Sequence, residues 1–312
     1  MLALLGGCNG ASQPAVPFSS ASDAAGSARQ NGAFDAGLYA VAFEEASIFG
    51  YKADDRRNRP PRCSIGGVAY VNDIAVDGKG NLIDPDGGSR TIRVFSGPGM
   101  CGPEIGSVSD PYGEPSDAAS ADAATGTIVV SNIFDGSGSG DGSLSLCTLS
   151  GGCTINLTNP QMHEVGGVAL ALNGDCWASV LNTNREARLI YFKGCSGPGR
   201  VASGFRNASL GGLDIDDAGN VVAIGLSGGA YVYKGCDPRC TRLGGPFPLS
   251  GTVVFGHLNQ QSTRLAVGNS GNAGVDVYRY SPTSITYIYS FNNGFSASDD
   301  VGGVAYNPRS KE

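Results

Sequence analysis

The chain repeats a short pattern about every 45 residues, and this repeat constrains the fold more than any other feature. The segment IAVDGKGNLI at 74–83 returns as LDIDDAGNVVAIG at 213–225, which lies 139 residues further along and close to three periods away. A related segment, VALALNGDCWASV, lies between them at 168–180. Short β-branched and aromatic runs that recur at this period indicate a radial array of small sheets.

Each repeat contains four expected strands, and six copies of each strand can be assigned. The first repeat begins at its second strand, however, and a lone first strand, VGGVAYNP, ends the pattern at 301–308. A ring of sheets must close to remove its exposed edges, so we expect this last strand to be the innermost strand of the first repeat. The expected innermost strands are 72–77, 116–122, 166–172, 210–216, 251–256 and 301–306.

The sequence therefore predicts an all-β fold, a six-bladed β-propeller over 37–308, built from four-stranded antiparallel blades and closed by the C-terminal strand. A β-sandwich is the alternative, but it does not explain the constant period. Trp177, the only tryptophan, is expected to pack in the core or between blades.

The repeat Gly-x-x-x-Asp-x-x-Gly-Asn-Val/Leu, followed by a loop and Ile/Val-x-Val-Phe/Tyr, resembles NHL-type repeats and those of SMP-30-type (gluconolactonase-like) propellers. The resemblance covers about 38–308 and is best at 72–95 and 211–233. It implies the propeller fold but no particular substrate, because propellers host many unrelated activities. Asp77 and Asp216 of this repeat are expected to hydrogen-bond their own turn backbone, which makes them turn residues rather than catalytic carboxylates.

The net charge of −7 excludes a basic face for nucleic acid, and the one basic cluster, RRNRPPR at 56–62, is interpreted as a solvated loop. Only two histidines are present, which disfavours a His-rich zinc site or a His-driven triad. No Gly-x-Ser-x-Gly elbow, P-loop or HExxH motif occurs.

The first residues resemble the lipobox of bacterial lipoproteins, since Leu5-Gly6-Gly7 precedes Cys8 after a short apolar run. By this resemblance Cys8 is lipidated, residues 1–8 are a signal remnant, and the protein is anchored at the outer membrane or cell surface, or is secreted. Residues 9–36 are rich in Ser, Ala, Gly and Pro and are predicted to be a flexible tether. The membrane would then be contacted through the lipid anchor alone.

The nine cysteines indicate an oxidising compartment. Two pairs, Cys147 with Cys153 and Cys236 with Cys240, flank the turn between the third and fourth strands of two repeats, so both are predicted to be disulfides. Cys176 with Cys195 is a third predicted bridge, because antiparallel pairing brings those strand ends together. Cys63 and Cys101 fall in neighbouring repeats and their pairing stays open, because a bridge needs a Cα separation of about 6 Å.

Candidate chemistry lies in the loops at one mouth of the ring. Gluconolactonase-like propellers bind a divalent cation with carboxylate and amide oxygens, and the resemblance implies that Glu114, Glu164, Asn207 and Asp299 could hold Ca²⁺ or Mg²⁺ in the same way. Ligand-binding candidates at the same mouth are Asn72, Asp73, His163 and Asn182. No catalytic residue is assigned. The loop at 134–143 lacks the bidentate glutamate of a calcium loop and is interpreted as a surface loop.

Three functions follow from these observations. The first is a surface-anchored or secreted binding module for a partner protein, glycan or small ligand. The second is a metal-dependent lactonase or esterase of the gluconolactonase type, which requires the four oxygen ligands to converge on one point. The third is a structural scaffold of the cell envelope.

Overall fold

The computed structural model describes residues 37–307, except for 54–57, 98–99, 120–125, 138–139, 207–209 and 226–228. The signal remnant, Cys8 and the tether fall on residues 1–36, outside the described part of the chain, and stay predictions. Within the described residues, no helix is long and apolar enough to cross a membrane.

Six four-stranded antiparallel sheets form a ring, which confirms the six-bladed β-propeller. From the innermost strand outward, blade 1 consists of β24 (Val301–Tyr306), β1 (Gly37–Ala42), β2 (Ser47–Lys52) and β3 (Cys63–Gly66). Blade 2 consists of β4 (Ala75–Val76), β5 (Leu82–Asp86), β6 (Thr91–Phe95) and β7 (Glu104–Ser109). Blade 3 consists of β8 (Gly113–Ala119), β9 (Ile128–Asp135), β10 (Ser143–Thr148) and β11 (Gly152–Leu157).

The last three blades continue in chain order. Blade 4 consists of β12 (Glu164–Leu170), β13 (Cys176–Leu181), β14 (Ala187–Phe192) and β15 (Arg200–Val201). Blade 5 consists of β16 (Leu213–Ile215), β17 (Val221–Gly225), β18 (Gly229–Lys234) and β19 (Thr241–Pro248). Blade 6 consists of β20 (Val253–Leu258), β21 (Arg264–Asn269), β22 (Gly274–Ser281) and β23 (Ser284–Phe291). Among the described residues, two short 3₁₀ helices, Lys193–Cys195 and Ser270–Asn272, lie in the connections.

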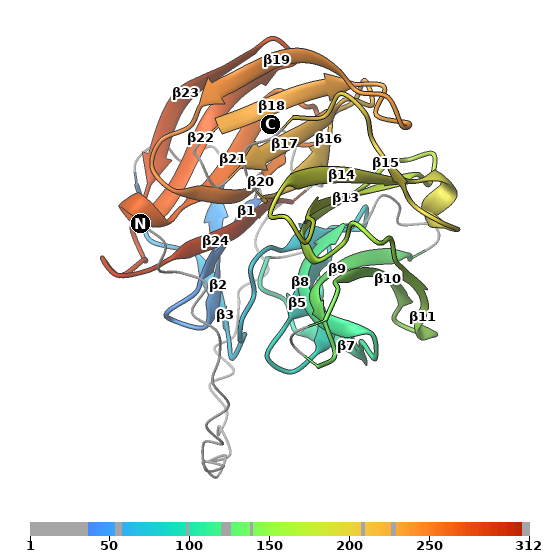
Figure 1. The fold of residues 1–312 in the computed structure, drawn as a ribbon. Coiled ribbons are helices and arrows are strands. Elements are labelled where there is room, and N and C mark those ends of the chain that lie inside the picture. Colours follow the sequence, from blue (N-terminus) through green and yellow to red (C-terminus); the bar gives the residue numbers. More distant parts are fainter. Residues whose placement is uncertain are drawn as a thin grey trace. The chain divides into compact units, whose positions relative to one another are not determined.

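The C-terminal strand β24 closes the ring, as the sequence predicts. It pairs antiparallel with β1, with Tyr39 opposite Ala305 and Ala40 opposite Val304 (Figure 1). The pairing extends one residue further, because the backbone N–H of Asn307 donates to the carbonyl of Gly37 at 2.8 Å. The first blade thus gains the innermost strand that its own stretch of chain lacks.

The hydrophobic core is divided into six clusters, and each cluster lies between two neighbouring blades. The cluster between blades 3 and 4, for example, joins Val129 and Leu144 to Val168 and Phe192. The cluster at the closure joins residues of the first blade, including those of β24, to Val275 and Val277 of the sixth. Each blade therefore buries its two faces against its neighbours rather than within itself.

Trp177 lies in the interface between blades 4 and 5, in agreement with its predicted packing role. Its ring packs near Tyr191, with the ring centroids 5.5 Å apart. Its indole N–H donates a buried hydrogen bond of 2.9 Å to the carbonyl of Cys236 in the next blade. The side chain thus ties two blades together by both apolar and polar contacts.

Four disulfides join cysteines in the described part of the chain, and they include the three predicted pairs Cys147–Cys153, Cys176–Cys195 and Cys236–Cys240. The pair left open by the sequence, Cys63–Cys101, is also bridged, with a Cα separation of 6.0 Å. This bridge joins β3 of blade 1 to the β6–β7 connection of blade 2, so it staples two blades. Several disulfides are consistent with a protein of an extracellular or secreted compartment.

The repeated aspartates perform the turn chemistry expected of them. Asp77 Oδ1 accepts hydrogen bonds from the backbone N–H groups of Lys79 and Asn81, both at 2.8 Å. Asp216 accepts the equivalent bonds from Ala218 and Asn220. Gly80 and Gly219 follow with φ of 83° and 76°, a conformation that strains any residue with a Cβ. The signature of the repeat therefore serves the fold.

Ending the chain at residue 300 should remove monomeric, cooperatively folded protein, because β1 would be left as an unpaired edge next to an open core. The matched control is a circular permutant that places 301–307 before Gly37 through a short Gly/Ser linker and ends at residue 300. The permutant keeps every strand and should melt within a few degrees of the parent by circular dichroism. A monomeric truncation with an unchanged melting temperature would contradict the closure role of β24.

Replacing Trp177 by Phe should destabilise the protein by about 1–3 kcal/mol, since the buried carbonyl of Cys236 loses its donor while most apolar contact is retained. Denaturant unfolding followed by circular dichroism measures this change. Tyr231→Phe, in the neighbouring blade, is the control for losing a polar atom from an aromatic ring. Equal stabilities for the two variants would show that the indole hydrogen bond contributes nothing.

Candidate functional site

The ring has two ends that differ in their connections. One end is formed by the links between successive blades, such as 110–112, 158–163 and 292–300, together with the links between the second and third strands of each blade. We call this end the loop mouth. We call the opposite end, formed by the turns between first and second strands, such as 77–81 and 259–263, the turn mouth. The four disulfides all lie toward the turn-mouth end of the blades.

A cluster of three aspartates and one histidine lies on the innermost strands, between these mouths. Asp73 lies two residues before β4, Asp117 is in β8, Asp214 is in β16 and His257 is in β20. These strands belong to blades 2, 3, 5 and 6, so the ring brings together side chains that are far apart in sequence. We call these four residues the axial cluster.

His257 is the centre of the axial cluster. Its Nε2 lies 3.2 Å from Oδ2 of Asp73, and its Nδ1 lies 3.4 Å from Oδ2 of Asp214. Its side chain is 13% exposed, whereas that of His163 is 34% exposed. The two imidazole nitrogens therefore face carboxylates from two different blades in a largely dry environment.

Two aspartates of the cluster also satisfy backbone donors of the next blade. Asp117 Oδ2 accepts the N–H of Val168 in β12 at 2.7 Å, and Asp214 Oδ2 accepts the N–H of Leu258 in β20 at 2.6 Å. An innermost strand has neighbours in its sheet on one side only, so its free edge needs acceptors when it is buried. The carboxylates supply them.

Burial raises the pKa of Asp73 and raises the pKa of Asp117 well above its usual range, and the charge of Asp73 adds to the effect at Asp117. For His257, burial alone would lower the pKa, but the carboxylates of Asp73 and Asp214 outweigh burial and hold the pKa well above its ordinary value. The axial cluster therefore favours a bound positive charge, whether a proton or a cation.

A cavity of about 170 Å³ leads to the axial cluster. Apolar side chains near the turn-mouth ends of the innermost strands, including Val76, Leu170 and Leu258, share its lining with Asp214, His257 and Gln260. The cavity is too small for a drug-sized molecule and suits waters, an ion or a very small ligand.

Asp73 of this cluster is among the ligand-binding residues predicted from the sequence, whereas Asp117, Asp214 and His257 are not. A signal for two of them was present, because Asp214 and His257 each stand two residues before the turn residue of their repeat, Asp216 or Asn259. Asp214 and His257 hold the same position in the repeats of blades 5 and 6, so their side chains lie at the same height along the propeller axis. Asp117 lies in a degenerate repeat, where this register is obscured.

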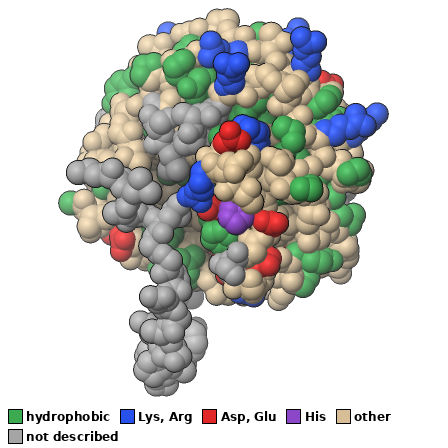
Figure 2. All heavy atoms as spheres, viewed as in Figure 1, with side chains coloured by type: hydrophobic (Ala, Val, Ile, Leu, Met, Phe, Trp, Pro, Cys, Tyr) green, Lys and Arg blue, Asp and Glu red, His purple; other side chains and the backbone are tan. Residues whose placement is uncertain are grey.

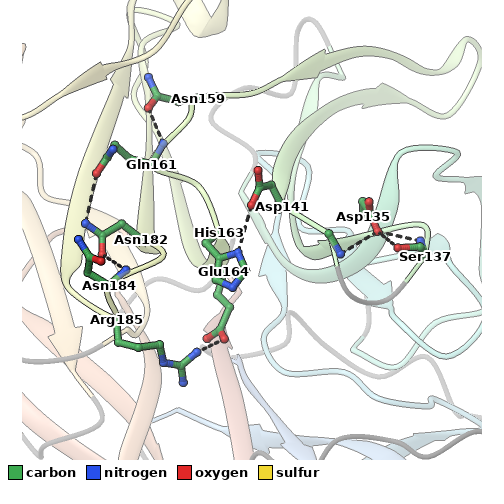
Figure 3. Close-up of polar contacts among 11 residues, drawn as sticks. Asp135, Ser137, Asp141, Asn159, Gln161, His163, Glu164, Asn182, Asn184 and Arg185 are labelled. Carbon is green, nitrogen blue, oxygen red and sulfur yellow. Dashed lines mark hydrogen bonds and ion pairs between the residues drawn. The ribbon is translucent and has the colours of Figure 1, made fainter.

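The loop mouth carries the predicted residues His163, Glu164 and Asn182, and Figure 3 shows how they lie. His163 Nδ1 is 3.1 Å from Oδ1 of Asp141, a residue of the preceding blade. The buried carboxylate of Glu164 forms an ion pair with Arg185. His163 and Glu164 thus point to different partners and do not form an acid–base pair.

Asn182 organises the next loop rather than standing free. Its Oδ1 accepts the backbone N–H of Asn184 at 3.0 Å, and its Nδ2 donates to Gln161 at 3.2 Å (Figure 3). The same Oδ1 also accepts the N–H of Glu186 at 3.0 Å. Asp135 caps its own loop in the same manner, by accepting the N–H of Ser137 at 2.8 Å. The loop at 134–143 is therefore held by turn chemistry, as far as it is described.

The remaining predicted metal ligands have separate neighbours. Glu114 lies 3.4 Å from Arg90, and Asp299 Oδ2 accepts the N–H of Ser296 at 2.8 Å. Asn207 lies outside the described residues, and Asn72 donates to Ser116 Oγ at 3.1 Å. Glu114, Glu164 and Asp299 do not form a group with ligand atoms within 4.8 Å of one another. The four-residue calcium or magnesium site therefore stays a prediction without support from these three residues.

Two groups of three potential ligands do meet that distance among the described residues. One is Asp110 with Cys147 and Cys153, but these cysteines are joined in a disulfide and offer no thiolate. The other is Asp73, Asp117 and His257 of the axial cluster.

Comparisons with known proteins identify the fold alone. No protein-family model and no curated protein matches the chain. Among solved structures, a chain from the crystal structure of a nidogen/laminin complex is similar, with a TM-score of 0.63 and 12% identity over 88% of this chain and 100% of that one. A protein of unknown function from Bacteroides caccae is similar with a TM-score of 0.60 and 10% identity, over 88% of this chain and 99% of that one.

Arg185→Met should destabilise the protein by about 1–2 kcal/mol, because it leaves the buried carboxylate of Glu164 without its partner while it keeps an apolar stem. The matched control is Arg188→Met, which removes the partner of the half-exposed Glu186 and should cost well under about 1 kcal/mol. Urea unfolding of both variants measures the difference. A larger loss for Arg188→Met would overturn this ranking of the two ion pairs.

Proposed function

We propose that this protein is a binding module of the cell envelope or extracellular space, and that its loop mouth binds a partner protein or a glycan. The observation that carries this proposal is the network of polar side chains shown in Figure 3. It joins residues of three successive loops, from the blade 3 loop that contains Asp141, through the 158–163 connection, to the blade 4 loop that contains Asn182.

Such a network favours binding because its side chains are already ordered. Hydrogen bonds within this region already hold Asn159, Gln161 and Asn182. Binding of a partner would therefore cost little conformational entropy for ordering these side chains. The network leaves exposed polar atoms at His163, Asn184 and Arg185 for a partner. On the face shown in Figure 2, acidic, basic and histidine side chains gather near the middle of the view, among mainly uncharged surface.

Two further observations support the proposal. The disulfides fit a compartment in which a propeller meets extracellular partners, and the predicted lipid anchor at Cys8 would hold it at the cell surface. The similar chain from the nidogen/laminin complex was crystallised as part of a protein complex, which is compatible with a binding role for a chain of this fold. At 12% identity this likeness names no partner for the present chain.

The alternatives drawn from the sequence have less support. A lactonase or esterase of the gluconolactonase type would need Glu164 and Glu114 to exchange their arginine partners for a cation. A purely structural scaffold would not need an ordered polar network at an exposed mouth. Both stay predictions behind the binding module.

The test is a binding screen of the purified protein against arrays of glycans and of extracellular proteins, with each hit measured by biolayer interferometry. The double variant His163→Ala/Asn184→Ala should weaken a genuine hit about tenfold or more, equivalent to about 1.4 kcal/mol. The control Lys79→Ala/Lys193→Ala changes exposed residues near the turn mouth and should leave affinity unchanged.

Loss of binding in the lysine control with retention in the loop-mouth variant would move the binding surface to the other end of the ring. A folded protein that binds no glycan or extracellular protein would contradict the proposal. Lactone hydrolysis that depends on added Ca²⁺ or Mg²⁺ and is lost in Glu164→Gln would support the enzyme instead.

A further inference from the structure

We propose that Asp73, Asp117 and His257 bind a divalent transition-metal cation, such as Zn²⁺ or Mn²⁺, on the axis of the propeller. Three blades each supply one ligand atom, and these atoms lie within 4.8 Å of one another. The site is distinct from the predicted set of Glu114, Glu164, Asn207 and Asp299, and it does not depend on the function proposed for the loop mouth.

The orientation of His257 favours a metal ion at Nε2. Asp214 Oδ2 lies 3.4 Å from Nδ1, so a proton on Nδ1 directs the lone pair of Nε2 toward Asp73. Histidines that bind metals commonly donate their other ring N–H to a carboxylate, which fixes the ring and its tautomer. Asp214 is in turn anchored by the N–H of Leu258, and it would be the positioning residue of this site.

Two hydrogen-bond acceptors, one from His257 and one from Asp73, lie close together. In that tautomer Nε2 of His257 and Oδ2 of Asp73 are both acceptors, yet they lie 3.2 Å apart, and neither has a hydrogen-bond donor among the described residues. Either a proton on Nε2 or a metal ion must therefore lie between or beside them. Two ligands each about 2.1 Å from a tetrahedral cation are about 3.4 Å apart, so the observed separation fits a shared metal ion.

Asp117 holds a buried carboxylate oxygen for which the described residues provide no hydrogen bond. Its side chain is fully buried, its Oδ2 is used by the N–H of Val168, and its Oδ1 has no hydrogen-bond partner among the described residues. A buried carboxylate oxygen without a partner is costly, and a second buried carboxylate beside it raises the cost. A divalent cation would bind this oxygen and offset the charge of both aspartates.

The ligand set selects the class of metal. One imidazole with two carboxylates suits Zn²⁺ or Mn²⁺, whereas Ca²⁺ and Mg²⁺ prefer oxygen ligands throughout. Three protein ligands also leave at least one position for water, and the 170 Å³ cavity that His257 helps to line has room for it.

The rival occupant of the axial cluster is a proton, carried by His257 or shared by Asp73 and Asp117. Metal-free protein titrated with ZnCl₂ and MnCl₂ by calorimetry should bind one equivalent of metal. His257→Gln and Asp117→Asn should each weaken binding about a hundredfold or more, and Asp214→Asn about 10- to 100-fold. His163→Gln removes the other histidine and should bind metal like the parent.

A second measurement uses the unaltered protein, so it does not depend on variants that fold. Zinc should shift the imidazole ¹⁵N signals of His257 and leave those of His163 in place. Co²⁺ should give the visible absorption of a site with nitrogen and oxygen ligands. A folded parent that binds no metal, or binding that survives His257→Gln but fails in His163→Gln, would overturn the proposal, and the axial cluster would then be a proton-bearing one.

Discussion

The structure depends on one constraint, which is that no blade can bury both of its faces alone. Each of the six apolar clusters is shared by two blades, so every blade is stable only while both neighbours are in place. The ring must therefore be complete, and the strand β24 completes it from the far end of the chain. The Cys63–Cys101 bridge and the Trp177 hydrogen bond reinforce two of these interfaces directly.

The same constraint creates the axial cluster. Closing the ring brings six innermost strands together around one line, and each strand has a free edge there. Asp117 and Asp214 cap the edges of the strands that follow them, and Gly303 leaves the room that Asp73 occupies, since a Cβ on Gly303 would lie 1.8 Å from Asp73 Oδ1. Charged groups thus gather on the axis partly for structural reasons, and their leftover acceptors give the site its affinity for a positive charge.

The sequence predicted features that are local or repeated. The blade strands, the closure by 301–306 and the three disulfides within blades follow from spacing inside a single repeat or from its displacement. The Cys63–Cys101 bridge and the meeting of His257 with Asp73 depend instead on how blades 1 and 2, and blades 2 and 6, approach one another, which spacing along the chain does not encode. The Glu164–Arg185 pair illustrates the same limit, because a partner from an adjacent loop occupies a carboxylate that the sequence offered to a cation.

The position of the disulfides divides the ring into a reinforced end and an open one. All four lie toward the turn mouth, where three of them cross-link strands or turns within one blade and Cys63–Cys101 cross-links two blades. None of these four disulfides lies at the loop mouth, where hydrogen bonds and the Glu164–Arg185 ion pair hold the described loops. Loops at the loop mouth can change length and composition without weakening the disulfide-bonded turn mouth. Descendants of this chain can therefore acquire new partners at the loop mouth while the blades keep their structure.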